Sequence, residues 1–93
     1  MNANFEIIEK ESIEGLRFPE TDVLEDTEEI NLRDSELNRA LSLGNLEHSK
    51  IKIYFEDDTS KKMVETTIWG ITDKRVILKQ GVVIPISRIY KTV

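Results

Sequence analysis

The residues best suited to bind a ligand lie between positions 52 and 91, where basic and aromatic side chains are interleaved. Basic side chains neutralise phosphates and aromatic rings stack on nucleobases, and small β-barrel proteins bind single-stranded nucleic acids with this combination. Tyr54 should point away from the core, because Ile53 and Phe55 alternate with it. Trp69 either shares that surface or closes one end of the fold. The candidate nucleic-acid-binding residues are Lys52, Tyr54, Lys61, Lys62, Trp69, Lys74, Arg75, Lys79, Arg88 and Lys91.

Catalytic and metal-binding residues are scarce in this sequence. His48 is the sole histidine, and its place between a predicted helix and a predicted strand favours capping or packing over acid–base chemistry. The absence of cysteine excludes disulfides, thiolate metal sites and cysteine nucleophiles. Asp57 and Asp58 are typical of a turn, although paired acids could also hold a cation loosely. With no phosphate-binding glycine loop or nucleophile motif, we expect a non-enzyme without metal or cofactor.

Charge divides the chain into two unequal halves. The formal net charge is −5, but residues 1–47 hold 13 acidic and 4 basic residues, a net charge of −9. Residues 48–93 hold 5 acidic and 9 basic residues, a net charge of +4. This asymmetry suggests an acidic segment attached to a basic module. The segment could fold back and shield the basic module, or it could bind a basic partner. Acidic stretches also keep small proteins soluble, and this reading stays open.

The length of 93 residues and the hydrophobic pattern predict one small domain preceded by an arm. Residues 1–30 show no sustained periodicity and include an acidic run, so we expect a flexible, acidic arm there. A helix follows, with Asn31 or Asp34 as its N-cap and Gly44 with Asn45 at its end. No long apolar run or export signal is visible, and cysteine is absent. We therefore expect a cytoplasmic location without membrane contact.

Residues 50–91 carry the signature of short antiparallel strands. Ile51, Ile53 and Phe55 alternate with polar or amphipathic side chains, which is typical of a half-buried strand. Further strand-like runs, separated by turns, occupy residues 64–69, 75–79, 82–86 and 87–90. Residues 31–93 are therefore expected to form a mainly β domain, in which a helix precedes a small antiparallel β-barrel of about five strands. The predicted core comprises Leu37, Leu41, Ile51, Ile53, Phe55, Ile68, Val76, Leu78, Ile84 and Ile89.

The order of these elements resembles the Sm-like family of bacterial RNA chaperones, Hfq, over about residues 32–93. The resemblance lies in the Leu-x-Asp-x-x-Leu-Asn pattern of residues 32–38, the strand at 51–55, the aspartate turn and apolar strand at 72–79, and the apolar segment at 84–89. It implies an Sm-like, SH3-type barrel whose identical subunits associate edge to edge. The same block also resembles an uncharacterised bacterial family of similar size, which implies no activity.

The sequence departs from the Sm-like family where that family binds RNA. Pro85, Ile86 and Ser87 stand in place of its Tyr-Lys-His step, and Arg75 replaces the aromatic residue after the aspartate turn. The resemblance therefore carries over Asp34 and the apolar framework, but not the binding of uridine-rich RNA in a central pore. Two functions compete: a non-enzymatic module that binds single-stranded RNA, and a protein-interaction or adaptor module that uses strand edges or the acidic arm.

Overall fold

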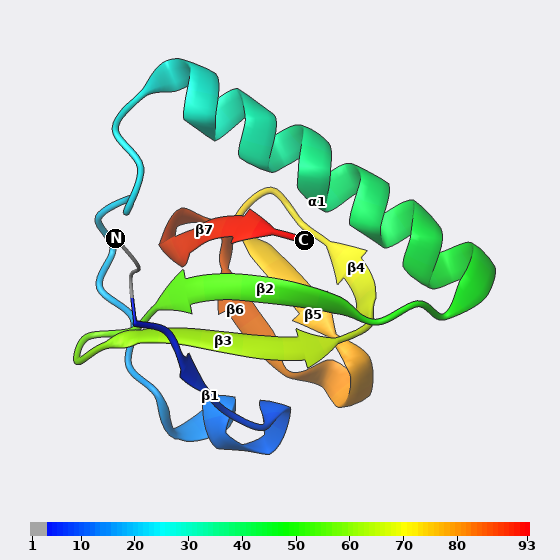
Figure 1. Ribbon diagram of the computed structural model, residues 1–93, viewed down its shortest axis with the longest axis horizontal. Coiled ribbons are helices and arrows are strands. Elements are labelled where there is room, and N and C mark those ends of the chain that lie inside the picture. Colours follow the sequence, from blue (N-terminus) through cyan, green and yellow to red (C-terminus); the bar gives the residue numbers. More distant parts are fainter. Residues whose placement is uncertain (1–3) are drawn as a thin grey trace.

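The computed structural model describes residues 4–93, in which one long helix and two β-sheets enclose a shared core (Figure 1). The helix, α1, spans Thr27–Glu47, and short 3-10 helices occupy Lys10–Gly15 (η1), Lys79–Gly81 (η2) and Ile86–Arg88 (η3). The strands are β1 (Glu6–Ile7), β2 (Ile51–Glu56), β3 (Lys61–Thr66), β4 (Ile68–Ile71), β5 (Arg75–Leu78), β6 (Val83–Pro85) and β7 (Ile89–Thr92). Within these residues the fold is mainly β with one α-helix, as the sequence predicted.

Two sheets with separate ladders stand in place of the single closed barrel that the sequence analysis expected. The first sheet has the strand order β1-β3-β2-β7, and the second has the order β4-β5-β6. Only Thr67 separates β3 from β4, so one bent segment of chain passes from the first sheet into the second. Among the described residues no ladder joins β6 to β7, because Pro85 has no N–H to donate and residues 86–88 coil into η3.

The core lies between the two sheets, and α1 and η1 cover it on opposite sides (Figure 1). On β2 the side chains of Ile51, Ile53 and Phe55 point inward, as strand alternation dictates. All of the predicted core residues are buried except Leu41, which is partly buried against the same cluster. The sequence analysis missed Ile13 of η1, which is only 2% exposed.

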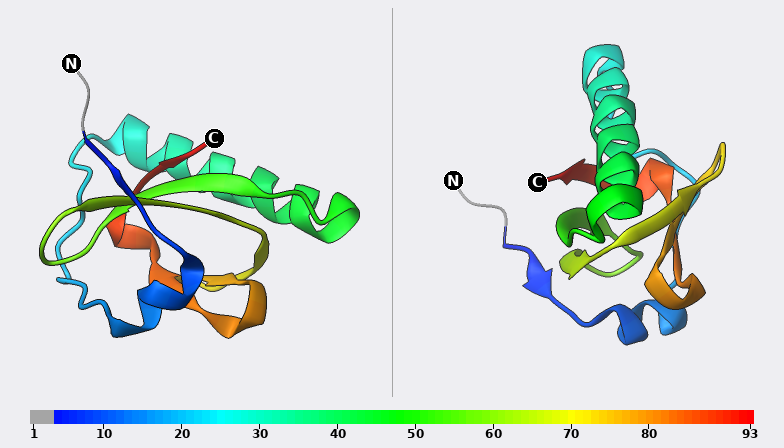
Figure 2. Two further views of the ribbon diagram at one scale, coloured as in Figure 1. Left: turned by 60° about the horizontal axis from the view of Figure 1, so that its bottom comes forward. Right: turned by 90° about the vertical axis from the view of Figure 1, so that its right-hand side faces the viewer.

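Residues 4–26, which the sequence analysis expected to be part of a flexible acidic arm, contact the sheets, the core and η3. β1 pairs in parallel with β3, Ile13 enters the core, and Leu16 and Phe18 pack against it. Figure 2 shows this segment running past β3 into η1. Burial of these apolar side chains offsets the self-repulsion that favours an extended acidic chain. Residues 1–3 of the predicted arm lie outside the described residues.

Helix α1 begins at Thr27, ahead of Asn31 and Asp34, the two alternative N-caps that the sequence analysis considered. Asp26 caps the helix, because its side chain accepts a hydrogen bond of 2.8 Å from the Glu28 N–H. Acidic side chains in the first turn also interact favourably with the positive end of the helix dipole. Residues 27–30, which were assigned to the arm, are therefore helical.

The helix continues through Gly44 and Asn45, its predicted end, and stops at Glu47. His48 caps it in the left-handed conformation, with a φ of 55°, and donates its backbone N–H to the Gly44 carbonyl. Gly44 permits close packing and does not terminate the helix, because a Cβ atom there would lie 2.6 Å from the Ile68 carbonyl oxygen. Within residues 4–93, no helix has the length and apolar composition needed to span a bilayer.

A buried arginine fastens α1 to the N-terminal segment and to β7. The Arg33 guanidinium donates two hydrogen bonds of 2.8 Å to the Asp22 carboxylate and one of 3.0 Å to the Ile89 carbonyl. The hydrogen bonds from Arg33 lower the pKa of the Asp22 carboxyl below its usual value. Such a bidentate ion pair fixes orientation as well as distance, so it holds the start of the helix in register with the first sheet.

Candidate nucleic-acid interface

Strand alternation brings several predicted binding residues to the outer face of the four-stranded sheet. Lys52 and Tyr54 point outward between the inward-facing residues of β2. On the neighbouring strands, Lys91 of β7 is the partner of Tyr54, and Lys61 of β3 is the partner of Glu56. We call the group formed by Tyr54, Tyr90, Lys61 and Lys91 the tyrosine–lysine face.

A β-bulge places Tyr90 on the tyrosine–lysine face. The register between β2 and β7 skips Tyr90, which stands between the paired residues Ile89 and Lys91. Its hydroxyl donates a hydrogen bond to the Glu56 carboxylate. Burial raises the pKa of Tyr90 to about 12, and the hydrogen bond to Glu56 adds to the shift. The phenol is uncharged near neutral pH, as an ordinary tyrosine also is, and its hydroxyl is held by the Glu56 carboxylate.

Phe5 from the N-terminal segment completes an aromatic cluster on this face. Its ring centroid lies 5.0 Å from that of Tyr54 and 5.8 Å from that of Tyr90, and both pairs are edge-to-face. Lys91 Nζ lies 5.2 Å from the Tyr54 ring centroid, and Lys61 Nζ lies 5.4 Å from the Tyr90 ring centroid. The cluster joins stackable rings to cations, the two features of a surface that binds single-stranded nucleic acid. Sequence reasoning missed Phe5, since nothing local relates it to residues 54 and 90.

A groove of about 480 Å³ opens where the start of β2 meets the end of β3. Four lysines line it, namely Lys10, Lys50, Lys52 and Lys79, and we call it the lysine groove. Lys52 and Lys79 were predicted as binding residues. Lys10 and Lys50 were missed, because Lys10 lies in the acidic half of the chain and Lys50 lies between a helix and a strand.

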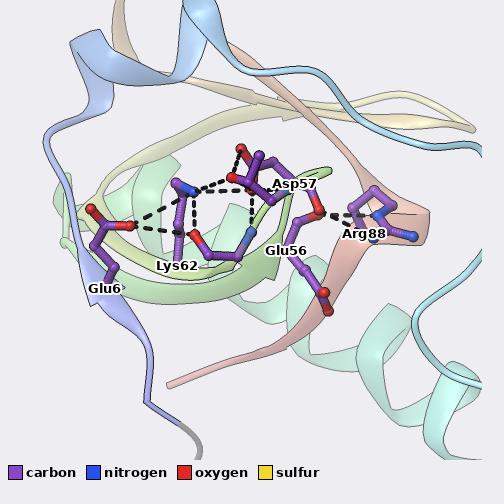
Figure 3. A network of polar contacts seen from close by, with 7 residues as sticks. Glu6, Glu56, Asp57, Lys62 and Arg88 are labelled. Atoms are coloured by element: carbon purple, nitrogen blue, oxygen red, sulfur yellow. Dashed lines mark hydrogen bonds and ion pairs between the residues drawn. The ribbon is translucent and has the colours of Figure 1, made fainter.

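Lys62 was predicted as a binding residue, but it is buried at the end of the β2–β3 hairpin (Figure 3). Its Nζ lies 3.0 Å from Asp57 Oδ1, 2.6 Å from Ser60 Oγ and 3.8 Å from the Glu6 carboxylate. Lys62 is opposite Phe55 in the register of the hairpin, so strand alternation directs its side chain inward. The structure therefore removes Lys62 from the candidate set.

Arg88 is removed for the same reason. It is 6% exposed and belongs to η3, and its guanidinium donates to the Glu56 carbonyl at 3.1 Å and to the Thr21 carbonyl at 2.7 Å. Figure 3 shows the side chain reaching the end of β2. These bonds hold η3 between the first sheet and the N-terminal segment, so the Arg88 guanidinium stabilises the fold and is not available to a ligand.

The other candidates divide between the two sheets. Trp69 is 52% exposed, so its ring lies at the surface and does not plug an end of the fold. Together with Lys74 and Arg75, which are also exposed, it belongs to the β4–β5 hairpin of the second sheet. The candidates that the structure places on the first sheet or beside it are Lys52, Tyr54, Lys61, Lys79 and Lys91.

Comparison of the chain with protein-family models, with curated proteins and with solved structures found no match. Membership of the Sm-like family therefore stays a prediction from the motifs of residues 32–93. A function can accordingly be inferred from the chemistry and placement of the side chains alone.

Proposed function

We propose that this protein is a non-enzymatic module that binds single-stranded RNA on the outer face of its four-stranded sheet. The observation that carries the proposal is the tyrosine–lysine face, where each tyrosine ring has an ammonium group within 5.4 Å of its centroid. Bases stack on the rings while the lysines neutralise the adjacent phosphates. Stacking is tolerant of sequence, so this surface favours single-stranded RNA without selecting particular bases.

We further propose that the domain is a divergent, cytoplasmic member of the Sm-like fold. In support, α1 precedes strands β2 to β7, and the path β7-β2-β3 continues through Thr67 into β4-β5-β6. The family's RNA-binding step is replaced here by Pro85, Ile86 and Ser87. The proposed RNA site therefore depends on other side chains than those of the family.

The N-terminal segment limits access to this site. Phe5 packs edge-to-face on both tyrosine rings, so a base must displace it before it can stack fully. The charge pattern suggested that acidic side chains of this segment shield the basic module. We propose that the Phe5 ring covers the binding surface instead. Phe5→Ala should raise the affinity for RNA by uncovering the rings, and a titration of this variant beside the wild-type chain measures the change.

Fluorescence anisotropy with a labelled single-stranded RNA tests the proposal on the full chain. Tyr54→Ala should weaken binding about 5- to 150-fold, because stacking of one base contributes about 1–3 kcal/mol. Trp69→Ala, an exposed aromatic residue on the other sheet, is the matched control and should leave the affinity unchanged. The logarithm of the affinity should fall with the logarithm of salt concentration, with a slope of about −0.7 per phosphate contact.

Two results would overturn the RNA proposal. One is the absence of binding at low salt in both the wild-type chain and Phe5→Ala. The other is an equal loss of affinity in Tyr54→Ala and Trp69→Ala, because binding would then not be located on the tyrosine–lysine face.

A protein-interaction module is the alternative, and the edge of the second sheet favours it. Among the described residues β6 has β5 as its single neighbouring strand, so its outer side can pair with another chain or with a second copy. Pro85 removes one donor from that edge. Light scattering that reports a ring of copies, combined with no RNA binding, would favour this alternative.

A further inference from the structure

The lysine groove is a concave feature that contains none of the four residues of the tyrosine–lysine face. Its volume of about 480 Å³ falls in the range of roughly 300–1,000 Å³ that is usual for small-molecule sites. Ile7, Ile8 and Met63 form an apolar part of its lining, and Thr66 and Thr67 lie beside them. The groove therefore combines an apolar wall with the charged side chains around it.

Four lysines from four separate segments line this groove. Lys10 belongs to η1, Lys50 to the connection between α1 and β2, Lys52 to β2 and Lys79 to η2. Among the described residues, Lys50, Lys52 and Lys79 form no ion pair, and Lys10 pairs with its sequence neighbour Glu11 at 2.9 Å. Three lysines without an ion pair thus line one groove, and an anion inside it would be attracted to each of them.

The lining of the groove carries a net positive charge. Glu9 and Glu65 also line it, so the lining residues have a formal charge of +2, which becomes +1 when the Glu11 partner of Lys10 is counted. A phosphate monoester carries a charge of about −1.5 to −2 at pH 7 and presents three acceptor oxygens. The lysine ammonium groups are donors of the kind that such oxygens accept.

We propose that the lysine groove binds a phosphate monoester attached to a small organic group, of the class of nucleoside monophosphates. The lysines hold the phosphate, and the wall of Ile7, Ile8 and Met63 receives the organic part. The groove shares no residue with the tyrosine–lysine face, but Lys52 projects from the same outer face of the sheet, so the test below includes a variant that separates the two proposals.

Titration of the ¹⁵N-labelled full chain with adenosine monophosphate, followed by amide NMR spectra, tests this proposal. We expect saturable shifts centred on the amides of Thr66, Thr67 and Lys79, with weaker binding of adenosine and of inorganic phosphate. Simultaneous Lys52→Gln and Lys79→Gln changes should weaken the binding of adenosine monophosphate about tenfold or more, because hydrogen bonds to charged groups contribute about 1.5–3 kcal/mol. Lys74→Gln, an exposed lysine outside the groove, should bind as the wild-type chain does.

Absence of saturable shifts, or shifts that persist undiminished in the doubly substituted chain, would overturn the proposal. Equal affinities for adenosine monophosphate and inorganic phosphate would overturn the assignment to a monoester. Tyr54→Ala separates this proposal from the RNA proposal, because it should weaken RNA binding and leave adenosine monophosphate binding intact.

Discussion

At the scale of single residues, the Asp57–Lys62 pair shows how this small fold accommodates buried charge. The Asp57 carboxylate accepts hydrogen bonds from the Ser60 N–H at 2.9 Å, the Thr59 N–H at 3.1 Å and Lys62 Nζ at 3.0 Å. Burial of Asp57 opposes its ionisation, but these donors outweigh the burial and lower its pKa to about 2. Asp57 thereby fixes the turn between β2 and β3, in keeping with its turn-like sequence context.

Stability should fall in acid as Asp57 becomes protonated. Its pKa of about 2 in the folded protein lies below the value of about 3.9 in an unfolded chain. The ionised carboxylate therefore stabilises the fold above about pH 4, and this contribution is lost as the pH falls towards 2. The loss from this group should reach about 2 kcal/mol, and urea unfolding at several pH values measures it.

Two variants assign the acid-dependent loss to Asp57. Asp58→Asn, at an exposed neighbour, should retain the loss. Asp57→Asn should abolish it and should also lower the stability at neutral pH, because the buried Lys62 loses its nearer carboxylate and keeps Glu6 at 3.8 Å. A pH profile for Asp57→Asn that matches the wild-type profile would contradict this explanation.

The packing of α1 can be tested at Gly44, with Gly15 of η1 as the control. Alanine normally stabilises a helix interior by about 1 kcal/mol relative to glycine. A Cβ atom at position 44 would lie 2.6 Å from the Ile68 carbonyl oxygen, so Gly44→Ala should instead destabilise the protein, by about 1–3 kcal/mol. Gly15→Ala should cost little, because no heavy atom lies within 4 Å of the added Cβ. Thermal unfolding compares the two, and equal Tm values would contradict the close approach of α1 to β4.

At the scale of elements, the docking of the N-terminal segment can be tested with two isoleucines. Ile13 of η1 is 2% exposed, whereas Ile7 of β1 is 75% exposed. Ile13→Ala should lower the free energy of unfolding by about 2–4 kcal/mol because it leaves a cavity in the core. Ile7→Ala should change it by less than about 0.5 kcal/mol. Chemical denaturation measures both values, and a negligible effect at Ile13 would show that the segment is detached in solution.

Local patterns in the sequence predict the strands better than they predict the ends and partners of elements. Alternation over residues 51–56 depends only on adjacent side chains, and it correctly directs Ile53 inward and Tyr54 outward. The start of α1 was predicted too late, because the acidic residues of its first turn look like part of a charge run. The docking of β1 on β3 could not be predicted, since the two strands are far apart in the chain.

The same limit applies to the candidate site. Alternation and charge suffice to suggest Tyr54 and Lys52 as surface residues. In the sequence, Lys62 and Arg88 cannot be distinguished from surface cations. Only the tertiary structure shows that Lys62 binds the Asp57 carboxylate and that Arg88 donates to backbone carbonyl oxygens. Phe5 gave no local signal either, because its partners are contributed by β2 and β7.

At the scale of the whole molecule, the two sheets should unfold together. Buried residues of β2 and β3 form one cluster with those of β4, β5 and β6, and the bent segment through Thr67 belongs to both sheets. A single domain with a shared core is expected to unfold in one two-state transition. The methyl resonances of Ile53 and Ile84, one from each sheet, should therefore be lost at the same urea concentration. Separate midpoints would show that the sheets unfold independently.

The parallel pairing of β1 with β3 also bears on how the chain acquires its shape during synthesis. Glu6 and Ile7 leave the ribosome well before Lys62 and Met63, their partners in the sheet. Until the β2–β3 hairpin has emerged, Ile8 and Ile13 have no apolar surroundings to enter. These early residues are thus among the last to reach their final positions, and a nascent chain that ends before β3 leaves their apolar side chains exposed.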